Sequence, residues 1–263
     1  MFHRLKFALP VGAAIFGLLP NQVGAFAYTS ATYGYDISYP QCGPPVFIPP
    51  SLASPSQAWN FGVIGVDGGW PFISTLHPGN GCLGQEYQGT VSPALYINTG
   101  YATVYTDANH TTTQCATLSH SVNGNSSQRK AWAVGCSEAS KSMSYAASQG
   151  ATYPSGWWLD VETANSWSSN TALNQYTIQG LVDTIHQNSP PSVPVGIYST
   201  AGQWAGVVGS RKVTGVAGDW VATAVPAQQA PAYCSQSFTG DRVWLVQYTA
   251  SYQGRSFDGD YAC

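Results

Sequence analysis

The sequence predicts one α/β domain built as a (β/α)8 barrel of the TIM type, with allowance for irregular elements and with disulfide bonds. Eight short apolar runs alternate with helical or loop segments, and all six cysteines lie beyond residue 27. The 236 residues from 28 to 263 show no break in composition and no linker. One barrel domain accounts for a chain of this length and pattern.

The first 27 residues have the pattern of a secretory signal peptide. Arg4 and Lys6 precede an apolar run over 7–19, and the small-residue motif Ala25-Phe26-Ala27 follows. The run is too short to remain as a membrane anchor. We therefore expect cleavage after Ala27, secretion of residues 28–263 as a single domain, and no membrane association of the secreted protein.

The cysteines indicate disulfides, because an even number in a secreted chain is typical of a disulfide framework and no C-x-x-C pair is present. Six cysteines allow fifteen pairings, which the sequence alone leaves open. Proximity along the chain favours Cys42–Cys82, Cys115–Cys136 and Cys234–Cys263.

Composition and motifs exclude several function classes. Without Arg4 and Lys6 the chain holds seven basic and twelve acidic residues, so nucleic acid and anionic membranes are not expected partners. The histidines lack the H-E-x-x-H spacing of a metal site, and G-x-S-x-G is absent. We expect a monomer without metal or cofactor, whose abundant Ser, Thr, Asn, Gln, Tyr and Trp suit contact with carbohydrate.

The predicted strands are mostly continuous apolar runs, as in parallel sheets buried on both faces. An open doubly wound sheet is the alternative, but no Gly-rich nucleotide loop follows any run. In chain order the expected strands are 33–37, 61–67, 94–98, 157–162, 195–198, 219–222, 243–248 and the weaker 256–258.

Three helices are expected between these strands. The Ala- and Ser-rich segment 137–148 ends before Gly150, and 170–188 carries apolar residues at helical spacing until Pro190 stops it. Segment 200–208 is a short third helix. The polar stretch 101–130 is expected to form a long loop tied by a disulfide.

Carboxylates mark the expected site. Asp160 and Glu162 end the apolar run 157–162, and residues two apart on a strand point to the same face. Their mutual repulsion raises one pKa, which glycosidic cleavage uses to separate an acid from a charged partner. Asp36, Asp67 and Asp258 also lie at strand ends, although a single Asp there is often a turn former or helix N-cap.

Aromatic residues near the same strand ends are candidates for sugar contact, because an aromatic face packs against the apolar face of a pyranose ring. A buried aromatic is equally ordinary core. The residues expected to bind substrate beside the three aspartates are Tyr96, Tyr198 and Tyr248.

In this order the strand-end motifs resemble glycoside hydrolase family 25, the secreted muramidases called Chalaropsis-type lysozymes. The resemblance covers most of residues 28–263. It is carried by Gly34-Tyr35-Asp36-Ile37-Ser38, Leu159-Asp160-Val161-Glu162, Gly196-Ile197-Tyr198-Ser199, Asp219-Trp220-Val221-Ala222, Val246-Gln247-Tyr248 and Phe257-Asp258-Gly259-Asp260.

This resemblance implies a glycoside-hydrolase-like barrel that cleaves the β-1,4 bond between N-acetylmuramic acid and N-acetylglucosamine in peptidoglycan. Glu162 would be the general acid. Asp160 would act as nucleophile or orient the acetamido group of the substrate, and Asp36 and Asp258 would complete an acidic mouth.

The segments 63–69 and 95–99 depart from the family pattern and are more similar to the family 25-like domains of secreted actinobacterial proteins. A catalytically weak or inactive carbohydrate-binding protein is therefore the alternative function. Family 18 chitinases share D-x-E within a longer acidic motif, but Ser155 and Trp158 occupy its earlier positions here.

Overall fold

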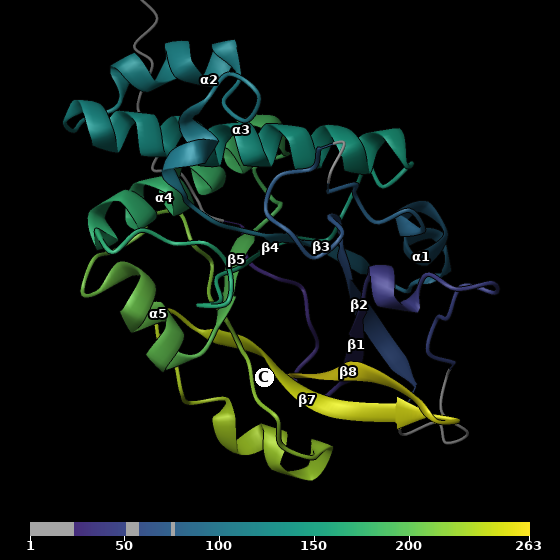
Figure 1. Cartoon of the computed structure of the whole chain (residues 1–263). Coiled ribbons are helices and arrows are strands. Elements are labelled where there is room, and N and C mark those ends of the chain that lie inside the picture. The colour runs from purple at the N-terminus through teal and green to yellow at the C-terminus, as the bar shows by residue number, and fades with distance from the viewer. Residues whose placement is uncertain (1–23, 51–57, 75–76) are drawn as a thin grey trace, which may run out of the picture.

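Eight strands close into one barrel in the computed structural model, which describes residues 24–50, 58–74 and 77–263 (Figure 1). Each predicted run forms a strand, and the order around the barrel follows the chain. The strands are β1 (Tyr33–Ile37), β2 (Trp59–Gly65), β3 (Pro93–Asn98), β4 (Trp157–Asp160), β5 (Val195–Ser199), β6 (Asp219–Val221), β7 (Val243–Tyr252) and β8 (Arg255–Ala262).

The closed barrel is confirmed, but the regular strand–helix repeat does not continue to its end. Neighbouring strands from β1 to β7 are parallel, whereas β8 is antiparallel to both β7 and β1. The hairpin between β7 and β8 turns at Gln253 and Gly254, which both have positive φ. Such a two-residue turn favours an antiparallel pair and leaves no room for a helix.

Helices lie outside the barrel and follow most of the parallel strands. The predictions 170–188 and 200–208 correspond to α4 and α5. The described helices are α1 (Leu83–Gly89), α2 (Thr113–Leu118), α3 (Ser126–Ser148), α4 (Thr171–Asn188) and α5 (Ala201–Val208), with 3-10 turns η1 (Tyr39–Gln41), η3 (Thr103–Thr106), η4 (Ser119–Ser121) and η5 (Ala227–Tyr233).

The prediction of a loop over 101–130 is wrong in part, because this segment contains α2 and the first turn of α3. Asn125 caps α3: its side chain accepts a hydrogen bond from the backbone of Gln128, whose own side chain accepts one from the backbone of Asn125. This reciprocal capping box satisfies the free N–H groups at the start of α3. The helix therefore begins 11 residues earlier than the predicted 137–148.

Helices α3 and α4 lie side by side on one flank of the barrel (Figure 1). Two glycines allow their backbones to touch. A Cβ on Gly135 of α3 would lie 1.8 Å from the carbonyl oxygen of Thr177, and one on Gly180 of α4 would lie 2.2 Å from that of Trp132. Only glycine fits such a close approach without displacing a backbone.

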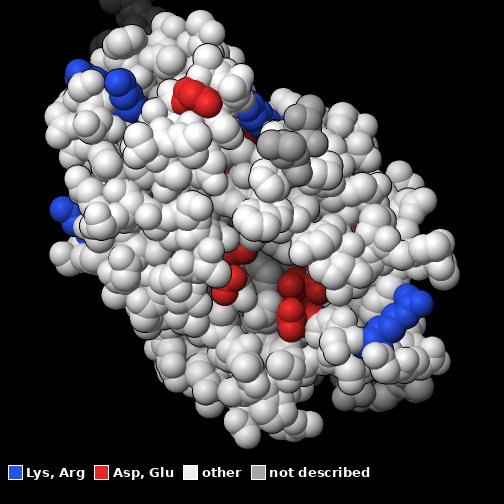
Figure 2. Space-filling model, in the orientation of Figure 1, with Lys and Arg blue, Asp and Glu red and all other residues white. Residues whose placement is uncertain are grey.

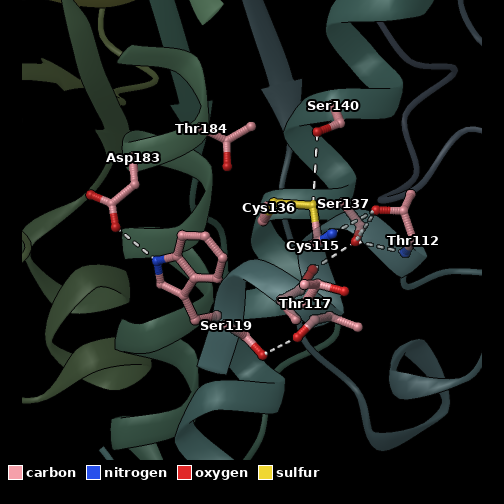
Figure 3. Close-up of a disulfide and its surroundings, with 12 residues drawn as sticks. Thr112, Cys115, Thr117, Ser119, Cys136, Ser137, Ser140, Asp183 and Thr184 are labelled. Atoms are coloured by element: carbon pink, nitrogen blue, oxygen red, sulfur yellow. Dashed lines mark hydrogen bonds between the residues drawn. A yellow bond between two sulfur atoms is a disulfide. The ribbon is translucent and has the colours of Figure 1, made fainter. Parts of the chain in front are cut away.

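All three expected disulfides form: Cys42–Cys82, Cys115–Cys136 and Cys234–Cys263. Figure 3 shows the second of these, between α2 and α3, with Ser140 at 3.9 Å from the sulfur of Cys115. Among the described residues no helix is long and apolar enough to cross a membrane.

The barrel interior is apolar at the end where the parallel strands begin. Every second strand residue points inward. Phe26, Phe61, Trp158, Trp220 and Leu245 fill this end as one buried cluster. The predicted signal peptide lies mostly outside the described residues, but Phe26 falls inside it and is 3% exposed, stacked on Trp158 at 4.2 Å between ring centroids.

Candidate active site

The carboxylate pair lies at the opposite end of the barrel, where β4 ends. Asp160 is the last residue of β4 and is 5% exposed, whereas Glu162, two residues further, is only partly buried. Trp158 belongs to the interior cluster, so the alternation of the strand directs Asp160 inward above it. The pair thus places one buried and one accessible carboxylate at the same strand end.

Glu162 is held by its surroundings on the β4–α4 loop. Its main-chain carbonyl accepts a hydrogen bond from the indole of Trp167 at 2.7 Å. Its carboxylate lies 3.5 Å from the side-chain amide of Gln203 in α5. These contacts position Glu162 at the rim while leaving the carboxylate accessible.

Asp160 is fixed from β3. Asn98 and Asp160 are paired in register, and the side-chain amide of Asn98 donates to Oδ2 of Asp160 at 2.7 Å. The backbone N–H of Asn98 donates to Oδ2 of Asp67 at 2.9 Å. Oδ1 of Asp160 is buried and accepts no hydrogen bond from any residue that the structure describes. One oxygen of Asp160 is therefore held, and the other is free for a further donor.

Across the mouth, Asp36 and Asp258 are directly paired on β1 and β8. Asp36 is buried and accepts a hydrogen bond from Gln247 Nε2 at 3.1 Å. The phenol of Tyr198 donates to Oε1 of the same glutamine at 2.8 Å. This chain of hydrogen bonds connects β1, β7 and β5 across the barrel.

The pKa values of these acids are raised, and burial is the main cause. Burial, followed by the charges of Glu162, Asp67 and Asp36, raises the pKa of Asp160 well above its usual range, against the hydrogen bond from Asn98. Burial and the charge of Asp258 do the same to the pKa of Asp36. The carboxylates are close enough to repel one another, so the site retains protons above the normal range for Asp.

Asp258 and Asp67 complete the acidic group. The Asp258 side chain is solvent-exposed at the mouth, yet partial desolvation and the charge of Glu162 raise its pKa. Asp67 is almost fully buried behind Asn98, and burial raises its pKa well above the usual range. Asp67 also forms an isolated bridge with Gly79. Of the two, only Asp258 is open to solvent.

Two of the three predicted tyrosines reach the mouth. Tyr96 and Tyr198 point inward, and burial, followed by the charges of nearby acids, raises the pKa of each phenol. Tyr248 does not reach it. Gln247 occupies the inward position of β7, and Tyr248 packs into a buried cluster on the outer face with Val221 and Val246. Strand alternation requires this result, because adjacent residues face opposite sides.

Three residues outside the predicted set belong to the site: Asn98, Gln247 and Asp260. Asp260 is fully buried, accepts a hydrogen bond from the Trp220 indole at 2.8 Å and lies inward on β8. Its spacing from Asp258 is the same i,i+2 signal as in the Asp160–Glu162 pair. Asn98 and Gln247 carry no charge, and only the register of their strands reveals them.

Figure 2 shows carboxylates on two sides of a hollow in the surface. Among the described residues no group of three or more His, Cys, Asp or Glu side chains is arranged to hold a metal ion. The predicted residues that share the mouth are Asp36, Asp67, Asp160, Glu162, Asp258, Tyr96 and Tyr198.

Comparisons with known proteins place the chain near lysozymes. The family model described as lysozyme-like protein 1, Lys-1, matches residues 81–225, just over half of the chain. The sequence has no significant match among curated proteins.

Two solved structures of the modular autolysin LytC from Streptococcus pneumoniae are similar to the chain. One, in complex with a synthetic peptidoglycan ligand, has 13% identity and a TM-score of 0.47. The other, at 1.6 Å resolution, has 14% identity and a TM-score of 0.46. Each comparison covers 88% of this chain and 46% of the LytC chain, so the protein spans about half the length of those structures.

Proposed function

Because the chain belongs to the lysozyme-like protein 1 family, we propose that it is a secreted glycoside hydrolase. Its substrate is a cell-wall glycan, peptidoglycan in particular, and Asp160 and Glu162 carry out the cleavage. One observation carries the proposal. A buried Asp160 and an accessible Glu162 leave the same strand end, so two neighbouring carboxylates lie in different environments. Two carboxylates in different environments are what acid-assisted cleavage of a glycosidic bond requires.

In the proposed reaction Glu162 donates a proton to the glycosidic oxygen, because its carboxylate is the one that solvent and substrate reach. Asp160 lies beneath it, and its buried Oδ1, which has no hydrogen-bond partner among the described residues, can accept a further hydrogen bond. Departure of the leaving sugar then leaves positive charge on the ring, which Asp160 stabilises in its ionised form. Water adds to the anomeric carbon and gives a proton back to Glu162, which completes the hydrolysis.

Asp36 and Asp258 act from the other side of the mouth. Their negative potential favours the oxocarbenium-like transition state, and Asp258 is exposed to hydrogen-bond a sugar hydroxyl. Tyr96 and Tyr198 offer ring edges and phenols to the sugar, whereas Asp67 supports the site through Asn98. Tyr248 supports the wall from outside.

We further assign the barrel to the irregular (β/α)8 class and the chain to the muramidases of glycoside hydrolase family 25 or their family 25-like relatives. Three disulfides form in an oxidising compartment, which agrees with export of a monomer after removal of an N-terminal signal. The partner is then cell-wall glycan, with no cofactor.

The test compares wild type with Glu162→Gln and Asp160→Asn on purified peptidoglycan from several cell walls and on N-acetylglucosamine oligomers. We expect new reducing ends from wild type and a loss of at least about 100-fold in each variant, as for removal of a general acid. Circular dichroism and thermal unfolding should remain like those of wild type. An absence of new reducing ends from wild type on every substrate would contradict the proposal.

A carbohydrate-binding protein without turnover is the second candidate, and the raised pKa of Asp160 favours it. A neutral Asp160 offers little stabilisation to a cationic ring. This function predicts that cell-wall fragments bind to wild type without product and bind equally to Glu162→Gln. Product formation by wild type would exclude it.

A further inference from the structure

Two large aromatic side chains are exposed beside the acidic mouth. Trp70, in the loop after β2, is 59% exposed, and Tyr39, directly after β1, is 50% exposed. Gly69, the residue before Trp70, lies against Tyr39, since a Cβ at this position would be 2.7 Å from the ring of Tyr39. The two rings therefore belong to neighbouring loops at the same end of the barrel.

The loop is built so that Trp70 faces solvent while the residues after it are packed. Pro71 lies against Gly100, where a Cβ would be 2.9 Å from the proline ring. Phe72 is 2% exposed in a cluster with Tyr101 and Val134. The loop thus buries the side chain of Phe72 and leaves that of Trp70 exposed, although the indole has the larger apolar surface.

Backbone conformation enforces this arrangement. Gly69 has φ 81° and Phe72 has φ 64°, so left-handed residues bracket Trp70. Left-handed φ is unfavourable for a bulky non-glycine residue and persists only where packing compensates. The burial of the Phe72 ring compensates for the backbone strain at this residue. The strained loop holds the indole of Trp70 in solvent.

Trp70 and Tyr39 together form an aromatic platform, and further contacts fix its orientation. The indole of Trp70 stacks on His77 at 4.9 Å between centroids with an interplanar angle of 28°. The Cys42–Cys82 disulfide joins the segment after Tyr39 to the end of the Trp70 loop. The Trp70 ring is therefore held by a stacking contact, which lowers the entropy lost when a ligand binds.

The platform is continuous with the acidic mouth. Ser38 precedes Tyr39 and lies against Tyr96: both side chains line the space that a Cβ on Gly65 would enter. Asp67 lies three residues before Trp70 and is bonded to Asn98, the partner of Asp160. A glycan in the mouth would meet the platform as it leaves over the ends of β1 and β2.

We propose that Trp70 and Tyr39 form a saccharide-binding subsite that holds a pyranose unit of the glycan strand outside the acidic mouth. The inference rests on the proposed function for the identity of its ligand. Aromatic faces exposed in water bind the apolar C–H face of a sugar ring, and the hydroxyls at the ring edge remain hydrated. The subsite gives affinity for long strands and orients them across Asp160 and Glu162.

The kinetic test uses Trp70→Ala, with Tyr153→Ala as the matched control. Tyr153 is 85% exposed on the loop before β4, at the opposite end of that strand from Asp160. We expect Trp70→Ala to raise KM for polymeric peptidoglycan about ten-fold, with a smaller effect on short fragments, and Trp70→Phe to restore most of the affinity. Tyr153→Ala should leave KM unchanged. Equal KM values for wild type and Trp70→Ala on the polymer would overturn the subsite.

A binding measurement separates failure of the subsite from failure of the catalytic proposal. Glu162→Gln, with and without Trp70→Ala, is titrated with a soluble peptidoglycan tetrasaccharide and with an N-acetylglucosamine tetramer, and Trp fluorescence and heat are recorded. A weaker Kd on loss of Trp70 supports the subsite even when wild type shows no turnover. An unchanged Kd, or no binding of either oligosaccharide to Glu162→Gln, overturns it. Thermal unfolding of each variant should match that of its parent.

Discussion

The side-chain amide of Asn98 donates a 2.7 Å hydrogen bond to Oδ2 of Asp160 between paired residues of β3 and β4. The backbone N–H of the same residue donates to Asp67 at 2.9 Å. Asn98 thus joins two buried carboxylates and opposes the effect of burial on the pKa of Asp160. We therefore regard Asn98 as a positioning residue that sets the pH range in which Asp160 ionises.

The first prediction concerns Asn98→Ala. Loss of the hydrogen bond removes an interaction that favours the charged carboxylate, so the pKa of Asp160 rises further. The ionised form then appears only at higher pH, and the acidic limb of kcat/KM against pH moves upward, by about one pH unit for an interaction of about 1.4 kcal/mol. The pH–rate profile on peptidoglycan measures this shift.

Asn165→Ala is the control for this variant. The side chain of Asn165 donates to the main-chain carbonyl of Asp160 at 3.3 Å and leaves its carboxylate untouched. It should alter the height of the profile more than its pH dependence. An acidic limb that stays in place in a folded Asn98→Ala protein would contradict the role of Asn98.

The acidic mouth has a periodic signal in the sequence, because Asp residues recur at the ends of strands. Residues two apart share a face, and this placed Asp160 above Trp158 and beside Glu162. The same rule, applied to β7, assigns only one of Gln247 and Tyr248 to the interior, and choosing between them needs the register with β8. Side-chain chemistry favours Tyr248 as the residue that contacts sugar, whereas the strand directs the amide of Gln247 inward.

The start of α3 and the β7–β8 hairpin were harder to predict for a different reason. Polar residues over 101–130 resemble a loop, although Asn125 and Gln128 form a capping box. The hairpin depends on Gln253, a non-glycine residue with φ 49°, which no periodicity reveals. Local backbone conformation and long-range strand register determine these two features. Neither of them produces a periodic pattern of apolar residues in the sequence.

The second prediction is a pH dependence of stability that arises from Glu86. This residue of α1 is fully buried, accepts a hydrogen bond from the side-chain amide of Asn80 at 2.6 Å, and burial raises its pKa to about 7. The folded protein therefore keeps this proton up to about pH 7, whereas the unfolded chain releases it near pH 4.5. The free energy of unfolding should fall as pH rises through this window.

Glu86→Gln should remove up to about 3 kcal/mol of that decrease, because the amide neither gains nor loses a proton between the two states. Denaturant unfolding of both proteins from pH 4 to pH 8 measures the difference. Parallel curves for wild type and Glu86→Gln would show that Glu86 titrates normally.

The third prediction concerns the disulfide between α2 and α3. Cys115 and Cys136 are separated by 21 residues, and both are buried. Replacing both with alanine should lower the free energy of unfolding by about 3 kcal/mol, since the bond restricts the unfolded chain. Ser140→Ala, which removes only the neighbour at 3.9 Å, is the control and should cost much less (Figure 3). Unchanged stability of the double variant would contradict the expected effect.

The last prediction concerns the position at which the proposed signal peptide is cleaved. Phe26 is 3% exposed and stacks on Trp158 at an interplanar angle of 7°, and the absence of a side chain at Gly156 makes room for its ring. Cleavage after Ala27 would remove this ring and open the apolar end of the barrel. Cleavage after the small residues Gly24-Ala25 would keep it, and a small-residue site is what signal peptidase requires.

We therefore expect intact mass and N-terminal sequencing of the secreted protein to show Phe26 as its first residue. Two refolded proteins test the physical reason. Residues 26–263 should be more stable than residues 28–263 by about 3 kcal/mol, the usual cost of deleting a buried phenylalanine ring. Phe26→Leu in the longer protein should recover part of that difference, because a leucine fills some of the space above Trp158. A secreted chain that begins at Tyr28 and unfolds at the same denaturant concentration as residues 26–263 would mean that the barrel closes without this ring.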